Sequence, residues 1–136
     1  MRSYLIVANQ TLTSASLADA IRARLAEGPI QTYVVVPLTP VGGRLTWDEQ
    51  ASLDVATARL DDVLARLREM GADADGEVGD RDPVAAVRDA VRGRTVDEVI
   101  VSTLPKGISR WLGEDVPSRL HEAITIPITV VTQAES

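Results

Sequence analysis

The sequence contains no cysteine and no phenylalanine, and its single lysine is Lys106. Without cysteine the chain has no disulfides, no thiolate metal ligands and no cysteine nucleophile. Without phenylalanine, and with two Trp and two Tyr, a stacking platform for single-stranded bases is not expected. The formal net charge of −6 at pH 7 also argues against non-specific binding to nucleic acid, which relies on clustered Lys and Arg.

Long hydrophobic runs are missing as well. The apolar run at the start, residues 4–8, is far shorter than the roughly 20 residues of a membrane helix. It is also shorter than the apolar core of a signal peptide. We therefore expect no membrane association and a cytoplasmic location.

Clustered catalytic or metal-binding side chains are also not apparent. His121, the single histidine, has no Ser or Asp partner at an informative spacing, and we expect a surface residue rather than a base. The aspartates of residues 73–82 lack the spacing of a calcium-binding loop. We therefore predict no catalytic residue, no enzyme activity and no metal site.

What the chain does contain is a regular alternation of short β-rich runs and helical patterns. The 136 residues fit one domain, residues 1–136, and 45% of them are hydrophobic, as in ordinary globular proteins. Strands are predicted at residues 4–8, 32–36, 74–78, 96–101 and 126–131. Helices are predicted from Ser14 or Ser16 to Gly28, over 46–70, from Pro83 to Gly93, and over 115–124.

The predicted helices each carry an apolar stripe. In the longest, three- and four-residue steps connect Leu53, Ala56, Leu60, Val63, Leu64, Leu67 and Met70. In the last, we expect Val116, Leu120, Ala123 and Ile124 to face inward. Asp82 followed by Pro83 is a typical N-cap and first position of a helix.

The character of each strand predicts its place in a sheet. The runs at 4–8, 32–36 and 96–101 are apolar throughout or nearly so, as is typical of interior parallel strands. The run at 74–78 is polar and contains Gly76, and the run at 126–131 alternates and contains Pro127, both features of edge strands. We therefore predict a doubly wound α/β domain with a five-stranded parallel sheet of order 3-2-1-4-5 and helices on both faces.

In that order the direction of winding reverses between the first and fourth strands, and ligands of open α/β sheets bind at such a point. Asn9 and Ser102 directly follow these two strands. In the loop after Ser102, the backbone of Gly107 and Ser109 could bind a phosphate, with Lys106 or Arg110 neutralising its charge. The alternative is an ordinary solvated loop, which the acidic pair Glu114 and Asp115 favours.

The stretch from Val99-Ile100-Val101-Ser102 through Pro127-Ile128-Thr129-Val130-Val131 resembles the C-terminal half of the universal stress protein family. The long Arg- and Ala-rich second helix and the residues 79–83 that open the third are also similar. The resemblance covers essentially the whole chain in element order. It implies the universal-stress-protein-like fold, which is adenine nucleotide alpha hydrolase-like, with the same strand order.

The resemblance also implies an adenine-nucleotide site. Many family members bind ATP through a loop with the pattern Gly, two residues, Gly, nine residues, Gly, then Ser or Thr. In this sequence Ser102 and Pro105 occupy the first two Gly positions, the spacer to Gly113 has seven residues, and Glu114 replaces the hydroxyl residue. Pro105 removes a backbone donor, and Glu114 would repel a triphosphate.

Two further positions match parts of the family site. Asn9 stands where ATP-binding members have an Asp, and the backbone near Val36, at the end of the second strand, would meet the adenine. A simple buried strand explains Val36 equally well. A receiver domain, which the sheet and Lys106 would suit, needs an acidic pair where this sequence has Asn9 and Gln10.

The function we expect is a regulatory or interaction module that does not use the standard ATP loop and has no cofactor. It would dimerise through the edge strand Ile126–Val131, as family members commonly do. The alternative is a protein that binds an adenine nucleotide or another small ligand in a remodelled pocket of Asn9, Lys106, Gly107, Ser109 and Gly113. A hydrolase is the least supported alternative, because no nucleophile and base pair is identifiable.

Overall fold

In the computed structural model, residues 1–8, 15–38, 49–103 and 116–132 are described. They form one parallel sheet of order β3-β2-β1-β4-β5, which confirms the predicted order. The strands are β1 (Arg2–Ala8), β2 (Ile30–Pro37), β3 (Asp73–Gly79), β4 (Glu98–Thr103) and β5 (Ile128–Thr132).

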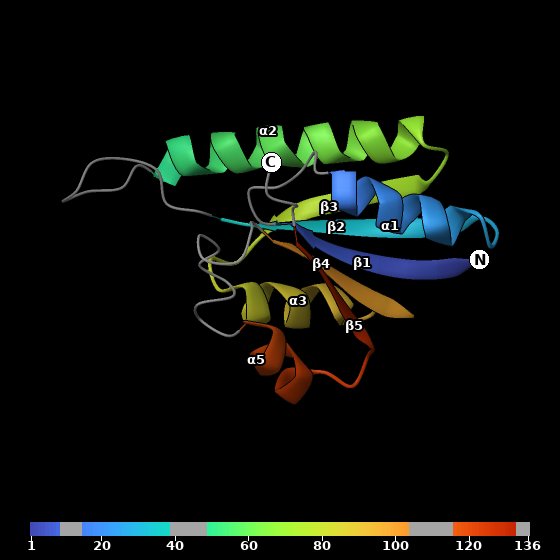
Figure 1. The fold of residues 1–136 in the computed structure, drawn as a ribbon. Coiled ribbons are helices and arrows are strands. Elements are labelled where there is room, and N and C mark those ends of the chain that lie inside the picture. Colours follow the sequence, from blue (N-terminus) through green and yellow to red (C-terminus); the bar gives the residue numbers. More distant parts are fainter. Residues whose placement is uncertain (9–14, 39–48, 104–115, 133–136) are drawn as a thin grey trace.

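Helices cover both faces of this sheet (Figure 1). On one face lie α1 (Ala15–Leu25) and α2 (Glu49–Glu69), and on the other lie α3 (Pro83–Val91) and α5 (Val116–Ala123). Each pair of helices encloses its own hydrophobic core. Successive residues of a strand point into opposite cores. Ile6 of β1 therefore packs toward α1 and α2, whereas Leu5 packs toward α3 and α5.

The three interior strands are mostly buried, as their apolar sequences predict, although Gln31 of β2 is exposed, and the two outer strands are partly exposed. In β1, residues 4–8 are all buried, and Val99, Ile100 and Val101 of β4 are fully buried. In β3, exposed and half-buried residues alternate, and in β5 Val130 is 38% exposed. The polar and alternating runs are therefore the edges, as predicted.

Asp82 takes the predicted role at the start of α3. Its side chain accepts a hydrogen bond from the backbone N–H of Val84, at 3.1 Å, and Pro83 is the first helical residue. The same carboxylate forms an ion pair with Arg119 of α5, at 3.1 Å. One aspartate therefore both begins α3 and connects it to its neighbouring helix.

Of the two predicted starts of the first helix, Ser16 is excluded, because α1 begins at Ala15 and includes it; Ser14 lies outside the described residues. Two expectations about inward-facing residues were wrong. Leu53 is 41% exposed, because the first turn of α2 directs Ser52 inward instead. Ala123 is exposed, because the inner face of the short α5 repeats every four residues, through Val116 and Leu120.

The strand boundaries also differ from the predicted ones, and β1 and β2 begin two residues earlier, at Arg2 and Ile30. The fourth strand begins at Glu98 rather than residue 96, and the last begins at Ile128 rather than residue 126. Pro127 precedes β5 and has no N–H to donate, but its carbonyl accepts a bond from Val99 N–H at 2.8 Å. The regular ladder therefore starts one residue after the proline.

Candidate functional site

The carboxyl ends of β1 and β4 meet in the middle of the sheet. Ala8 lies opposite Ser102 in the register of these strands, and Ser102 in turn lies opposite Val131 of β5. Ser102 is completely buried. Because Ile6 and Ile100 face the α1–α2 side, the side chains two residues later, Ala8 and Ser102, lie on that face as well.

Val36 lies on the same face as Ala8 and Ser102, near the carboxyl end of β2. Its side chain is buried in the core beneath α1 and α2, and its register partner is Val78 of β3. The structure therefore brings Ala8, Val36 and Ser102 to the carboxyl end of the strands and to one face of the sheet. At this end, between β1 and β4, the direction of winding reverses, and this is the predicted place for a ligand.

The other predicted site residues lie outside the described residues. They are Asn9, Lys106, Gly107, Ser109 and Gly113, together with Pro105 and Glu114 of the altered loop. Their grouping around Ser102 and Val36 stays a prediction.

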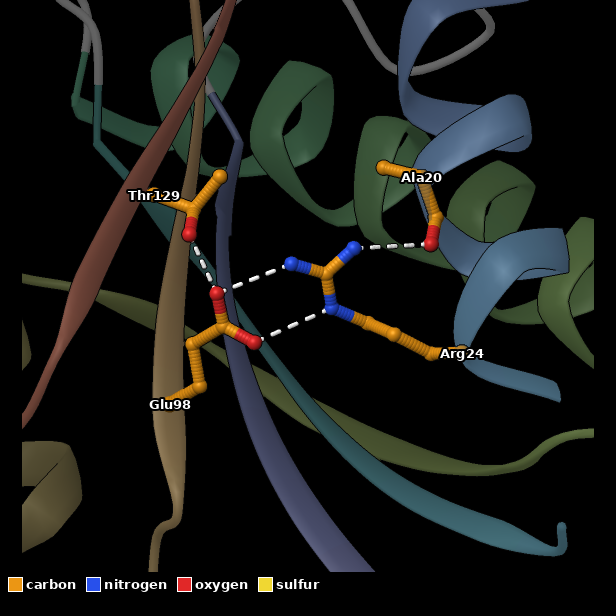
Figure 2. A network of polar contacts seen from close by, with 4 residues as sticks. All are labelled: Ala20, Arg24, Glu98 and Thr129. Carbon is orange, nitrogen blue, oxygen red and sulfur yellow. Dashed lines mark hydrogen bonds and ion pairs between the residues drawn. The ribbon is translucent and has the colours of Figure 1, made fainter. Parts of the chain in front are cut away.

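A polar network that the sequence analysis missed joins α1, β4 and β5 (Figure 2). Arg24 binds Glu98 in a bidentate manner, with Nε to Oε1 at 3.0 Å and Nη2 to Oε2 at 2.8 Å. Its Nη1 donates to the carbonyl of Ala20 at 2.9 Å, and the Thr129 hydroxyl donates to Glu98 Oε2. Glu98 is therefore the acceptor shared by a helix and the edge strand.

The aromatic ring of Tyr4 completes the surroundings of this ion pair. The Arg24 guanidinium lies 5.5 Å from the centre of the Tyr4 ring, a distance at which a cation and a ring attract each other. The side chains of Arg24 and Glu98 are 18% and 16% exposed, so both are largely removed from water. The sequence contained one signal for this network: Glu98 is a charged residue at the start of an interior parallel strand, and a buried charge there needs a partner.

The charges of the network are stabilised in their ionised forms. Burial alone would raise the pKa of Glu98, but the hydrogen bonds from Arg24 and Thr129 and the nearby positive charge outweigh it, and the pKa is lowered. The hydrogen bond to Glu98 raises the pKa of Arg24 against the effect of burial. Both residues are therefore charged near neutral pH.

The lowered pKa of Glu98 predicts a pH dependence of stability. Because the folded-state pKa lies below the unfolded value, the stabilisation is complete above the unfolded pKa and is lost as pH falls through the folded pKa. The difference in unfolding free energy between wild type and Glu98→Gln should therefore be largest near neutral pH and shrink in acid. Urea unfolding of both proteins across the acid range measures this difference, and a constant difference would contradict it.

A second feature lies at the opposite, amino-terminal end of the sheet. A hollow of about 300 Å³ opens beside Tyr33 of β2, and Arg94, Thr95 and Val96, between α3 and β4, form one wall. The Arg94 guanidinium lies 3.7 Å from the centre of the Tyr33 ring. Burial, followed by the hydrogen bond to Glu77, raises the pKa of Tyr33, so its hydroxyl stays protonated and donates to Glu77 at 3.1 Å.

Within the described part of the chain, no three His, Asp or Glu side chains gather in a way that could hold a metal ion. In the same part, none of the helices has the length and apolar character needed to span a bilayer.

Comparison with known proteins gives matches in structure and none in sequence. No protein-family model matches the chain, and no curated protein is similar enough in sequence to count as a relative.

The structural matches are universal stress proteins that align along nearly the whole chain. The universal stress protein from Archaeoglobus fulgidus is 16% identical, with a TM-score of 0.66 over 96% of this chain and 93% of that one. The Archaeoglobus fulgidus protein in complex with dAMP is 20% identical, with a TM-score of 0.61 over 96% and 99%.

A protein from Arabidopsis thaliana is similar in structure over the same extent of the chain. The universal stress protein family protein from Arabidopsis thaliana with AMP bound is 10% identical, with a TM-score of 0.58 over 97% of this chain and 92% of that one. These likenesses extend over both halves of the sheet, and the strand order is the one that the resemblance in sequence implied. The chain therefore has the fold of the universal stress proteins.

Proposed function

We propose that the protein is a divergent member of the universal stress protein family, acting in the cytoplasm as a regulatory or interaction module rather than as an enzyme. The observation that carries the proposal is the fold likeness, which covers 96% of this chain in the first Archaeoglobus match. The departures at Ser102, Pro105 and Glu114 support a module that does not use the standard ATP loop.

The proposed module is a homodimer that pairs through β5. This strand is last in the sheet order, and among the described residues its outer edge faces no other strand. An open strand edge carries unpaired backbone groups and favours pairing with another strand. Val130, 38% exposed, adds an apolar side chain to this surface, and pairing between identical edges gives a closed two-fold dimer.

Replacing Val130 by aspartate is expected to convert the dimer into a monomer, because it places a charge in the exposed apolar surface next to the strand edge that would be buried on pairing. Leu53→Asp is the matched control: Leu53 is 41% exposed, but it lies on α2, away from β5. Sedimentation at micromolar concentration should show a dimer for wild type and Leu53→Asp and a monomer for Val130→Asp. A monomeric wild type, or a dimer unaffected by Val130→Asp, would refute dimerisation through β5.

A second function is favoured by the ligands of the structural neighbours, which include dAMP, AMP and cAMP. In this alternative the protein binds an adenine nucleotide or another small ligand near Ala8, Val36 and Ser102. Asn9 and Lys106 would supply polar contacts, with the backbone of Gly107, Ser109 and Gly113. A monophosphate demands less neutralising charge than a triphosphate, which suits a loop with one lysine.

Titration with AMP and ADP tests this alternative. If it holds, AMP should raise the melting temperature, and Lys106→Ala should weaken AMP binding by about tenfold, the effect of losing one charge-assisted contact. Arg92→Ala is the control, because Arg92 is exposed and follows α3 at the other end of the sheet. The absence of heat and of a thermal shift with either nucleotide would remove this alternative.

A further inference from the structure

The hollow at the amino-terminal end of the sheet lies away from Ala8, Val36 and Ser102 at its carboxyl end. Ser3, Gln31, Tyr33 and Asp75 line it from three neighbouring strands, and Arg94 and Thr95 line it from the connection between α3 and β4. In the register, Ser3 is the partner of Gln31, and Tyr33 is the partner of Asp75. By strand alternation these four side chains lie on the face that α3 and α5 cover.

The cationic side of this hollow is held in place by two contacts. Arg94 Nη1 donates to the carbonyl of Ala90, near the end of α3, at 2.9 Å, and the guanidinium stacks on the ring of Tyr33. Tyr33 is itself fixed by its hydrogen bond to Glu77. A guanidinium has five N–H donors, and the bond to Ala90 uses one of them. Arg94 is therefore oriented in advance and has donors left for an anion.

The anionic side is Asp75, which lies across from Tyr33 on β3. Neighbouring strands lie about 5 Å apart, and Asp75 and Arg94 both line the hollow next to Tyr33. Asp75 Oδ1 accepts the N–H of Gly76 at 2.8 Å. The carboxylate has further acceptor positions on its two oxygens.

We propose that this hollow binds a small zwitterion of the α-amino acid class, with its carboxylate on Arg94 and its ammonium on Asp75. One positive and one negative side chain line the hollow, which matches a ligand that carries both charges. Ser3, Gln31 and Thr95 add hydroxyl and amide groups that suit a polar ligand. A volume of about 300 Å³ is at the small end for ligand sites and suits an amino acid better than a nucleotide.

The test is titration of the isotope-labelled full chain with the common L-α-amino acids, one at a time, followed by amide NMR. Acetate and methylammonium serve as probes that carry only one of the two charges. We expect at least one amino acid to shift the amides of Ser3, Gln31 and Thr95 in a saturable way, while Ala8 and Ser102 stay unchanged. Acetate or methylammonium alone should bind at least about tenfold more weakly, because each forms one of the two charged contacts.

Two variants remove one charge each without touching the core, because Arg94 and Asp75 are both exposed. Arg94→Gln and Asp75→Asn should each weaken the binding of that amino acid by about tenfold or more. Arg92→Gln and Asp73→Asn, which change nearby exposed charges outside the lining, should leave it unchanged.

Three results would overturn the proposal. They are the absence of saturable shifts with every amino acid, acetate binding as tightly as the amino acid, and unchanged affinity in Arg94→Gln and Asp75→Asn. Amide spectra of the two variants without ligand show whether each is folded, so that a loss of binding is not confused with unfolding.

Discussion

Replacing Glu98 by glutamine is expected to lower the free energy of unfolding by about 2 kcal/mol near neutral pH, a typical value for a lost hydrogen-bonded charge. The amide carries no charge, so Arg24 keeps its positive charge but loses the carboxylate that compensates it in a largely buried position. The Thr129 hydroxyl also loses its charged acceptor. Urea unfolding followed by circular dichroism measures the change.

A double-mutant cycle separates the interaction energy between Arg24 and Glu98 from the general effect of removing a charge. Arg24→Gln and Glu98→Gln should couple strongly, because the double variant leaves no unpaired charge. Arg22→Gln is the matched control: Arg22 is also on α1 and pairs with Asp19 at 3.2 Å, but both side chains are highly exposed. Its expected cost is a few tenths of a kcal/mol. Equal costs for Arg22→Gln and Glu98→Gln would refute a stabilising role of the network.

Replacing Gly76 by alanine is expected to destabilise the protein by about 2 to 3 kcal/mol, the upper part of the range that is typical of overpacked cores. A Cβ at this position would lie 2.4 Å from the carbonyl oxygen of Val34 and 2.8 Å from Cδ1 of Leu60 in α2. Leu60 could rotate, but the oxygen belongs to the backbone of the neighbouring strand. The strand pair β2–β3 or the packing of α2 must therefore shift. Thermal and urea unfolding measure the loss.

Asp73→Ala is the control for Gly76→Ala, because Asp73 is also on β3 and its side chain is exposed. We expect it to change the stability by less than about 0.5 kcal/mol, as is usual for surface substitutions. If Gly76→Ala were no more harmful than Asp73→Ala, the close packing of β3 beneath α2 would be wrong.

The sheet could be predicted from the sequence because interior and edge strands differ in composition. Residues 4–8 are wholly apolar and became a central strand, whereas the polar run around Gly76 became an edge. In the sequence, Gly76 served only as one of the features that indicate an edge strand. The structure adds a steric reason for it, the approach of Leu60, which a local pattern cannot reveal.

The charge of Glu98 in an interior strand indicated that it needs a partner, but the identity of that partner, Arg24, could not be predicted because the two residues are 74 positions apart in the chain. In the sequence, Arg24 is one of two arginines near the end of an amphipathic helix. No neighbouring residue distinguishes it from the exposed Arg22. The stacking of Arg94 on Tyr33 was equally hard to predict from the sequence, because it joins the connection before β4 to a side chain of β2. Contacts of this kind depend on how the elements pack.

The candidate site at the carboxyl ends was partly predictable. Strand order alone places Ser102 beside Ala8, and the register confirms that neighbourhood. The chemistry of the site depends on loop residues such as Asn9 and Lys106, which lie outside the described residues. The sequence of the altered loop, with Pro105 and Glu114, disfavours a triphosphate.

Calorimetric titration of the wild-type protein with ATP and Mg²⁺ tests most directly the claim that this chain combines the universal stress protein fold with a loop that does not bind ATP. We predict no saturable heat at ATP concentrations up to about 1 mM, which corresponds to a binding free energy weaker than about −4 kcal/mol. Saturable binding of one ATP per chain with a micromolar dissociation constant would contradict the account.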